Sequence, residues 1–333
     1  MFDFLFSAGG MVVMPAWIAL AAAPWLKRGK TAIWTITGLL AYGALWIGRP
    51  LGAAVRELER RNRPLMRFGC VLFVALAAAW VAELIDGRTL NGVGVWVKPM
   101  KFMASVGLYA WTTAWLLGEL PPTLRQGQWA RAIVAVVIVA GAGEIAYITF
   151  QGALGQPSHF NSSTPFHAVM YALMGLGALA ITACALPLAW LIARHGSGMA
   201  PAYRLGAVLG LILTFAGGAG AGIAISLNGG PTVGAMPGGA VVPLFGWSMT
   251  GGDLRVAHFL GVHAQQVLPA VGMWTAMAGA RARVPATAGA GAHVAAGAVS
   301  WDVAAVGLAA LAYAGLTAVA GLQAAAGVPL LLP

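Results

Sequence analysis

Residues 129–151 read WARAIVAVVIVAGAGEIAYITFQ, a run of apolar residues whose charged side chains are Arg131 and Glu144. An α-helix needs about 20 mostly apolar residues to cross a hydrocarbon core of roughly 30 Å. This run is long enough, so we expect it to form a membrane-spanning helix. At a rise of about 1.5 Å per residue, Glu144 would lie about 22 Å from Trp129 along that helix, inside the hydrocarbon layer.

The rest of the chain repeats this pattern. Hydrophobic residues make up 60% of the 333 residues and charged residues 8%, and the mean hydropathy is +0.82. Soluble domains use roughly 25% charged residues. We therefore expect an all-α integral membrane protein, with residues 1–333 forming a single transmembrane bundle of about nine helices. The expected spans are 8–26, 31–48, 66–85, 100–120, 129–151, 165–193, 204–227, 253–279 and 301–325, with a low-complexity linker at 281–300 before the last.

The nineteen basic residues lie mostly in the short connections between these runs, and the formal net charge is +10. Basic residues in loops are the usual topology signal of membrane proteins, and here they form no continuous stripe of the kind that binds nucleic acid. We therefore expect membrane lipid, and no nucleic acid, as a partner. A cytoplasmic N-terminus puts twelve of the nineteen on the inner side of a bacterial inner membrane. The segment 49–65 is then a basic cytoplasmic connection, either a topology anchor or a contact with anionic lipid.

In this orientation the connections 86–99, 152–164 and 228–252 all open on the outer side. The third has 25 residues, is rich in glycine and proline, and has no helical pattern. Long loops in compact bundles tend to be lids or binding loops, so we expect a structured outer cap over a cavity. The sequence TGGD at 250–253 fits a capping box for the next helix, with Thr250 as the N-cap.

Ionisable side chains inside the expected spans are candidates for function, because they are costly in hydrocarbon. Glu144 and His258 each lie about 8 Å below the outer edge, so the two could meet as a catalytic pair. His263 lies about 15 Å deep, His167 lies near the outer mouth, and His159 belongs to the cap. Glu144 and these four histidines are the candidate metal ligands, because imidazole and carboxylate groups bind zinc, copper and iron.

The stretch HFLGVH limits what His258 and His263 can do together. Five residues on a regular α-helix leave two side chains roughly 140° apart, whereas metal-binding pairs prefer spacings of three or four. Either the two histidines serve different partners, or a π-bulge near Gly261 brings them together. Farther along the same helix, Pro269 should cause a kink and free the carbonyl group of Gln265.

Lys98 and Lys101 lie in the first turn of a helix that Pro99 opens, where cations oppose the helix macrodipole. We expect an anion nearby, which could be Glu83, Asp86, a lipid phosphate or an acidic ligand. The alternative is that both lysine side chains extend along the helix and place their ammonium groups at the membrane interface. The candidate cofactor-binding residues are Lys98, Lys101, Asn161 and Gln265.

Two helical faces carry further polar residues. Glu144, Tyr147 and Gln151 share one face, and His167 and Tyr171 share another together with methionines. A face of histidine and methionine suits copper or haem, although such stripes are more often plain core.

Four strings resemble a family of bacterial multi-pass membrane proteins to which no activity is attached: KPMKF at 98–102, SHFN at 158–161, TPFH at 164–167 and GWSMTGGDLRVAHFLGVHAQQVLP at 246–269. The resemblance covers about residues 90–275. It implies membrane localisation and a shared site in the outer half, but no activity. The residues of that implied site are His159, Asn161, Asp253, His258 and His263. The family often has an acidic residue where this chain has His167, which puts His167 in doubt as a required ligand, although aspartate also binds metal.

Three functions fit these features. The first is a membrane enzyme or redox protein that holds zinc, copper, iron or haem and acts on a lipid-soluble small molecule. The second is a proton-coupled transporter or channel, in which Glu144 and the histidines relay protons. The third is a structural subunit of a membrane complex or a homo-oligomer. The first requires Glu144, His258 and His263 to converge within ligand distance.

Overall fold

The computed structural model describes residues 52–242, 245–282 and 300–330, and the chain divides into two units, Met1–Arg60 and Arg61–Pro333. In the first unit, residues 52–60 are helical, and Arg60 forms an ion pair with Glu57 at 2.7 Å. The connection 49–65 is therefore largely helical where it is described. The expected spans 8–26 and 31–48 and most of the linker 281–300 lie outside the described residues.

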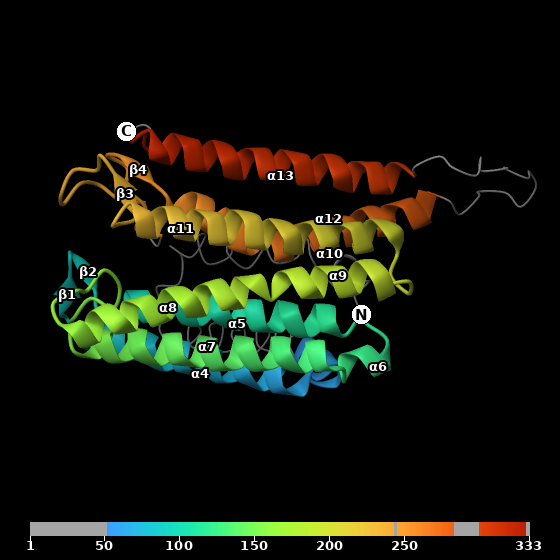
Figure 1. The fold of residues 1–333 in the computed structure, drawn as a ribbon, viewed down its shortest axis with the longest axis horizontal. Helices are drawn as coiled ribbons and strands as arrows, with labels where there is room; N and C mark the ends of the chain where they lie inside the picture. Colours follow the sequence, from blue (N-terminus) through green and yellow to red (C-terminus); the bar gives the residue numbers. More distant parts are fainter. Residues whose placement is uncertain (1–51, 243–244, 283–299, 331–333) are drawn as a thin grey trace, which may run out of the picture. The chain divides into compact units, whose positions relative to one another are not determined.

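The second unit consists mainly of helices (Figure 1). These are α4 (Arg63–Ile85), α5 (Val97–Leu117), α6 (Pro122–Arg125), α7 (Gln128–Ala153), α8 (Pro165–Ala183), α9 (Ala185–His195), α10 (Pro201–Leu213), the π-helix η1 (Thr214–Ala219), α11 (Gly220–Leu227), α12 (Arg255–Ala282) and α13 (Trp301–Ala325).

Five described helical segments are long and apolar enough to cross a membrane. They are Arg63–Ile85, Gln128–Ala153, Pro165–His195, Pro201–Leu227 and Trp301–Ala325. The expected spans 100–120 and 253–279 also form helices, α5 and α12, which are more polar. The expectation of a helical membrane protein therefore holds, and nine spans remain a prediction.

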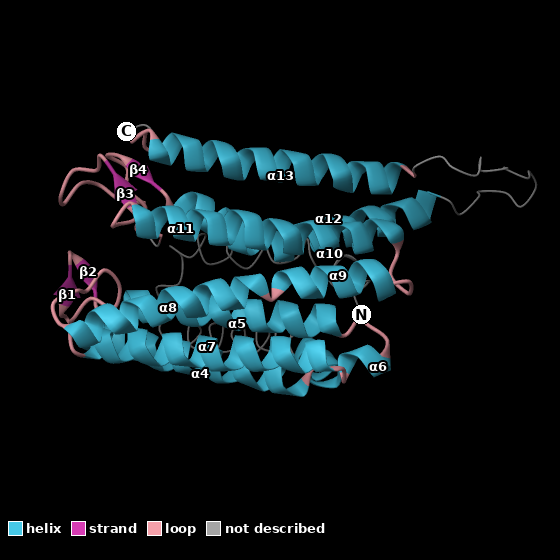
Figure 2. Cartoon of the chain, in the orientation of Figure 1, coloured by secondary structure: helices cyan, strands magenta, loops and turns pink. Residues whose placement is uncertain are grey.

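Local chemistry sets where several helices begin and bend. Asn62 caps α4 by accepting a hydrogen bond from the backbone N–H of Leu65 at 3.1 Å. Thr164 caps α8 in the same way, with Pro165 in the first turn. The helix that starts there is interrupted at Cys184 (Figure 2). Pro187 explains the interruption, because its ring displaces the carbonyl group four residues earlier and it has no N–H to donate.

The helices pack in a simple order. α4 packs on α5, α5 on α7 and α7 on α8, while α10 packs on α12 and α12 on α13. α8 also contacts η1 and so joins the two sets. The first set buries Leu72, Met103 and Ile145 together, and the second buries Val256 and Ala320.

The backbones of α12 and η1 cross closely. A Cβ atom added to Gly261 would lie 2.2 Å from the backbone nitrogen of Gly218, so only glycine allows the two backbones this approach. Next to the crossing, the hydroxyl of Thr214 accepts a hydrogen bond from the N–H of Gln265 at 3.0 Å. The π-helical turns thus lie in the partner of α12, whereas α12 itself is α-helical from Arg255 to Ala282, through Pro269.

The connections 86–99, 152–164 and 228–252 lie at one end of the helices (Figure 1). β1 (Thr89–Leu90) and β2 (Val93–Gly94) form a hairpin whose turn residues, Asn91 and Gly92, have positive φ angles of 53° and 77°. β3 (Thr232–Val233) pairs with β4 (Gly252–Asp253). Both strand pairs, β1 with β2 and β3 with β4, are antiparallel. We call this end the cationic end, because Lys98, Lys101 and Arg255 lie there.

The predicted capping box at TGGD was wrong. α12 begins at Arg255, and the carboxyl of Asp253 accepts the hydrogen bond from the N–H of Arg255 at 3.0 Å. Thr250 instead accepts a hydrogen bond from the N–H of Met236, within the loop. The reason is that pairing with β3 holds Gly252 and Asp253 in an extended conformation, which delays the start of the helix.

Candidate functional site

His258 and His263 face different neighbours. His258 Nδ1 lies 2.8 Å from the carbonyl oxygen of Gly218 in η1, and its ring packs against Gly222 of α11. A carbonyl oxygen can only accept, so His258 carries its proton on Nδ1 and leaves Nε2 unprotonated in the neutral ring. In the described residues no hydrogen bond reaches that Nε2.

His263 belongs to a contact between α12 and α5. Its Nδ1 lies 3.3 Å from the side-chain oxygen of Gln266, and its ring lies against Phe259 with centroids 4.3 Å apart. Gln266 donates to the hydroxyl of Thr112 on α5 at 3.0 Å. Because α12 stays α-helical here, the two histidines point apart and have separate partners, which is the first of the two alternatives that the HFLGVH spacing left open.

Glu144 lies in the middle of α7 and is 7% exposed. Its Oε1 has no hydrogen-bond partner among the described residues. A Cβ atom added to Gly177 on α8 would lie 3.2 Å from this oxygen, so the glycine leaves room for the carboxyl group. Glu144 therefore faces α8, and no hydrogen bond or ion pair joins it to His258 or His263 in the described chain.

A hydrogen-bonded triad lies one to two turns along α7 from Glu144. It consists of Tyr147 and Gln151 on α7 and His167 on α8. Gln151 Nε2 lies 2.8 Å from the hydroxyl of Tyr147 and 3.1 Å from Nδ1 of His167, and that hydroxyl lies 3.0 Å from the same Nδ1. An amide NH₂ group can only donate, so Nδ1 of His167 accepts, and the hydroxyl of Tyr147 donates to it. His167 lies in the first turn of α8 and connects this network to the cationic end.

Lys98 and His159 form a second pair at the cationic end. The ammonium of Lys98 lies 3.1 Å from Nδ1 of His159, which also lies 3.2 Å from the hydroxyl of Ser158. Burial, and then the charge of Lys98, lower the pKa of His159 to about 3. The imidazole is therefore neutral and accepts a hydrogen bond from the ammonium, so the pair keeps one positive charge.

Lys101 and Arg255 hold the loop 228–252. Lys101 donates to the carbonyl of Phe245 at 2.9 Å, and Arg255 donates to the carbonyl of Gly246 at 2.7 Å. Arg255 also pairs with Asp253, whose side chain is 1% exposed. Asp253, which the family resemblance placed in the site, thus orients Arg255 and caps α12.

Asn161 and Gln265 differ in whether their side-chain amide atoms are free to bind a ligand. The amide of Asn161 donates to the carbonyl of Pro157 and accepts from the backbone and hydroxyl of Ser163, so it fixes the loop between α7 and α8. Gln265 is 1% exposed, and neither its side-chain nitrogen nor its oxygen has a partner in the described chain. Of these two candidate cofactor contacts, Gln265 alone keeps free hydrogen-bonding atoms.

The expected metal set does not come together in the described residues. Within ranges 52–242, 245–282 and 300–330, no three histidine, cysteine, aspartate or glutamate side chains are grouped so as to hold a metal ion. Glu144 faces α8, His258 faces η1, His263 contacts Gln266 of its own helix, and His159 faces Lys98. The geometric reason is that Glu144 lies on α7, His159 lies in the loop after α7, and the two histidines of α12 lie on different faces of that helix.

The anion expected beside the lysines is also not a nearby carboxylate. Asp86 is held by Arg88 at 2.7 Å and by the indole N–H of Trp96, and these two hydrogen bonds lower its pKa. Glu83 accepts from the backbone N–H of Trp96 at 3.2 Å. Among the described residues, neither Lys98 nor Lys101 forms an ion pair.

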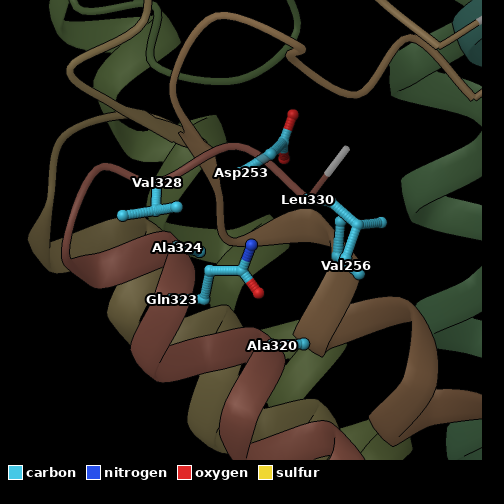
Figure 3. A pocket seen from close by; sticks show the side chains of 7 residues that line it. All are labelled: Asp253, Val256, Ala320, Gln323, Ala324, Val328 and Leu330. Atoms are coloured by element: carbon cyan, nitrogen blue, oxygen red, sulfur yellow. The ribbon is translucent and has the colours of Figure 1, made fainter. Parts of the chain in front are cut away.

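A small cavity lies beside the start of α12. It has a volume of about 10 Å³, enough for about one water molecule. Figure 3 shows its lining side chains, which come from β4, the start of α12, the end of α13 and the segment that follows. They are Asp253, Val256, Ala320, Gln323, Ala324, Val328 and Leu330. This cavity is too small for an organic substrate.

Three contributors to these sites were not among the candidate site residues of the sequence analysis. Tyr147 and Gln151 were recognised as sharing the face of Glu144, but no role was predicted for either. Their bonds to His167 depend on how α7 meets α8, which a single sequence does not show. Arg255 had a detectable signal, since an acidic residue, Asp253, precedes it by two positions at the start of α12.

Comparisons of the chain with protein-family models, with curated proteins and with solved structures find no match.

Proposed function

We propose that the protein is a proton-coupled transporter or channel of the bacterial inner membrane, with about nine spans and a cytoplasmic N-terminus. The observation that carries this proposal is Glu144, a buried carboxyl group in a membrane-spanning helix whose Oε1 has no partner in the described chain. Ionisable groups at such depth are costly and usually belong to ion pathways or proton relays.

The triad next to Glu144 supplies a route for the proton. Tyr147 lies three residues further along α7, a rise of about 4.5 Å, which one water molecule can bridge. The hydroxyl of Tyr147 donates to Nδ1 of His167, and Gln151 holds both groups in place. A proton released by Glu144 passes to the Tyr147 hydroxyl while that hydroxyl gives its own proton to His167. His167 then releases the proton on its other nitrogen at the cationic end.

Proton flux into liposomes tests this proposal. The full-length protein is reconstituted with a pH-sensitive dye inside, and a pH gradient is applied together with a potassium diffusion potential. We expect flux above that of empty liposomes, lost in Glu144→Gln and slowed at least tenfold in His167→Ala, since a positioned proton-transfer group contributes about 10² or more. Glu57→Gln, which removes a carboxyl outside the membrane-spanning helices, is the matched control and should keep the flux. Full flux in Glu144→Gln would overturn the proposal.

A second candidate is a metal- or haem-binding membrane enzyme or redox protein acting on a lipid-soluble substrate. The observation that favours it is the hydrogen bond from Nδ1 of His258 to the carbonyl of Gly218. Metal-binding histidines usually donate their second nitrogen to a carbonyl or carboxylate in this way, which leaves Nε2 ready to bind. Metal analysis and a visible absorption spectrum of wild type and His258→Ala test it. A metal or haem retained equally by both would remove His258 as the ligand.

A further inference from the structure

Positive charge at the cationic end exceeds the negative charge that neutralises it. Lys98, Lys101 and Arg255 come together there, and the charge of Arg255 acts on both lysines. Asp253 neutralises Arg255 alone. Lys98 is half-buried against neutral His159 and Lys101 is bound to a carbonyl oxygen, so both lysine charges remain without a counterion in the described chain.

The start of α5 adds to this positive potential. Lys98 and Lys101 lie in or next to its first turn, and Trp96 provides no side-chain cap there. The first turn holds no acidic residue, so the positive end of the macrodipole adds to the charge of the two ammonium groups, and Glu83, which accepts from the N–H of Trp96, offsets part of this potential. A group of like charges of this kind is unfavourable unless an anion lies among them.

Aromatic side chains next to the cations indicate what carries the anion. Phe245 and Trp247 stack with ring centroids 4.4 Å apart, and Phe259 meets both edge-on. Phe245 and Phe259 are each 37% exposed. Tryptophan is enriched at the headgroup level of a bilayer, and Trp247 lies beside Arg255 and Lys101 through the loop that they bind. The anion is therefore expected to belong to an amphiphile whose apolar part lies against these rings.

We propose that Lys98 and Lys101, held in place by His159 and by the loop that Arg255 anchors, bind the phosphate of an anionic membrane lipid. The ammonium groups provide the charge, and the three aromatic rings contact the glycerol and upper acyl region. The lipid site shares the cationic end with the exit of the proton route but uses different side chains, because Glu144 lies on the face of α7 toward α8.

Native mass spectrometry of the full-length protein in detergent tests this site. The protein is titrated with phosphatidylglycerol, phosphatidylcholine and inorganic phosphate, and the dissociation constants are measured. We expect phosphatidylglycerol to bind at least tenfold more tightly than the other two. Each basic residue near a membrane surface contributes about 1 kcal/mol, or about fivefold in affinity. Lys98→Gln and Lys101→Gln should therefore each weaken phosphatidylglycerol binding about fivefold, and the double variant about 25-fold.

Two further variants make the result specific. Arg194→Gln removes an exposed cation of α9, away from the cationic end, and should change the affinity less than twofold. The charge-conserving double variant Lys98→Arg with Lys101→Arg should restore most of the binding. Equal binding of inorganic phosphate and phosphatidylglycerol would overturn the lipid as the source of the phosphate. Phosphatidylglycerol affinity that is unchanged in the double glutamine variant would overturn the site itself.

Discussion

His258 donates a hydrogen bond from Nδ1 to the carbonyl oxygen of Gly218, 2.8 Å away, across the crossing of α12 and η1. This contact explains why the two histidines of HFLGVH do not act as one chelating pair. The irregular turns lie in η1, opposite Gly261, and α12 keeps the regular α-helical geometry that separates the two rings.

The crossing predicts that Gly261→Ala destabilises the protein. Its Cβ would lie 2.2 Å from a backbone atom of Gly218, which no side-chain rotation relieves. Forcing extra atoms into a packed interface costs about 3 kcal/mol when the backbone has to move. Thermal unfolding in detergent should show a clear decrease in the midpoint. Gly315→Ala on α13, where the new Cβ meets nothing within 4 Å, should leave it unchanged, and equal midpoints in both variants would contradict the close crossing.

A matched pair of glycines on α8 tests the space around Glu144. Gly177→Ala places a Cβ 3.2 Å from Oε1 of Glu144, whereas Gly175→Ala meets nothing within 4 Å. We expect the first substitution to displace the carboxyl group and slow proton flux in liposomes by about tenfold, roughly 1.4 kcal/mol in the barrier. The second should behave as wild type. Equal proton flux in both variants would show that the Glu144 carboxyl beside Gly177 does not carry the proton.

The buried histidine at the cationic end predicts a pH dependence of stability. The pKa of His159 is about 3 in the folded protein, against an ordinary value of 6.5. Between these values the unfolded chain binds the proton and the folded chain does not, so the free energy of unfolding falls as the pH falls below about 6.5. The contribution is complete above that pH.

His159→Asn isolates this effect. The variant should show a shallower loss of stability between pH 6.5 and pH 4, by up to one proton per molecule, in detergent unfolding curves. Between pH 7 and pH 9 the difference between variant and wild type should stay constant. An identical slope below pH 6.5 would mean that folding does not keep His159 neutral.

The hydrogen bond from Gln266 to Thr112 predicts an energetic coupling between α12 and α5. Hydrogen bonds between membrane helices average about 0.6 kcal/mol in double-mutant cycles. The cycle of Thr112→Val and Gln266→Leu should give a coupling of about that size, measured from the free energies of unfolding of the four proteins. Strictly additive effects would show that the contact contributes nothing.

Periodicity and length were enough to predict where the described helices lie. The run 129–151 became α7, Gln128–Ala153, and the expected span 301–325 coincides with α13. These positions follow from local hydropathy and from breaking residues, which a sequence displays directly. The expected span 165–193 likewise begins at Pro165, where α8 starts.

The site was harder to predict, because it depends on which helices meet. Depth alone placed His258 opposite Glu144, yet Glu144 faces Gly177 of α8 and His258 faces Gly218 of η1. A helical rotation of about 100° per residue decides such pairings, and a single sequence fixes the face of each helix but not its neighbour. The π-helical turns of η1 at Gly217 and Gly218 were not predicted either.

The central claim is that Glu144 exchanges protons with the cationic end through Tyr147 and His167. Time-resolved infrared spectroscopy of the reconstituted protein after a pH jump measures this directly, through the carboxylic acid carbonyl band. We predict a band that appears on acidification, is missing in Glu144→Gln, and forms at least tenfold more slowly in Tyr147→Phe, which keeps the ring and removes the hydroxyl. A band that is missing from wild type, or that forms equally fast without the Tyr147 hydroxyl, would contradict the account.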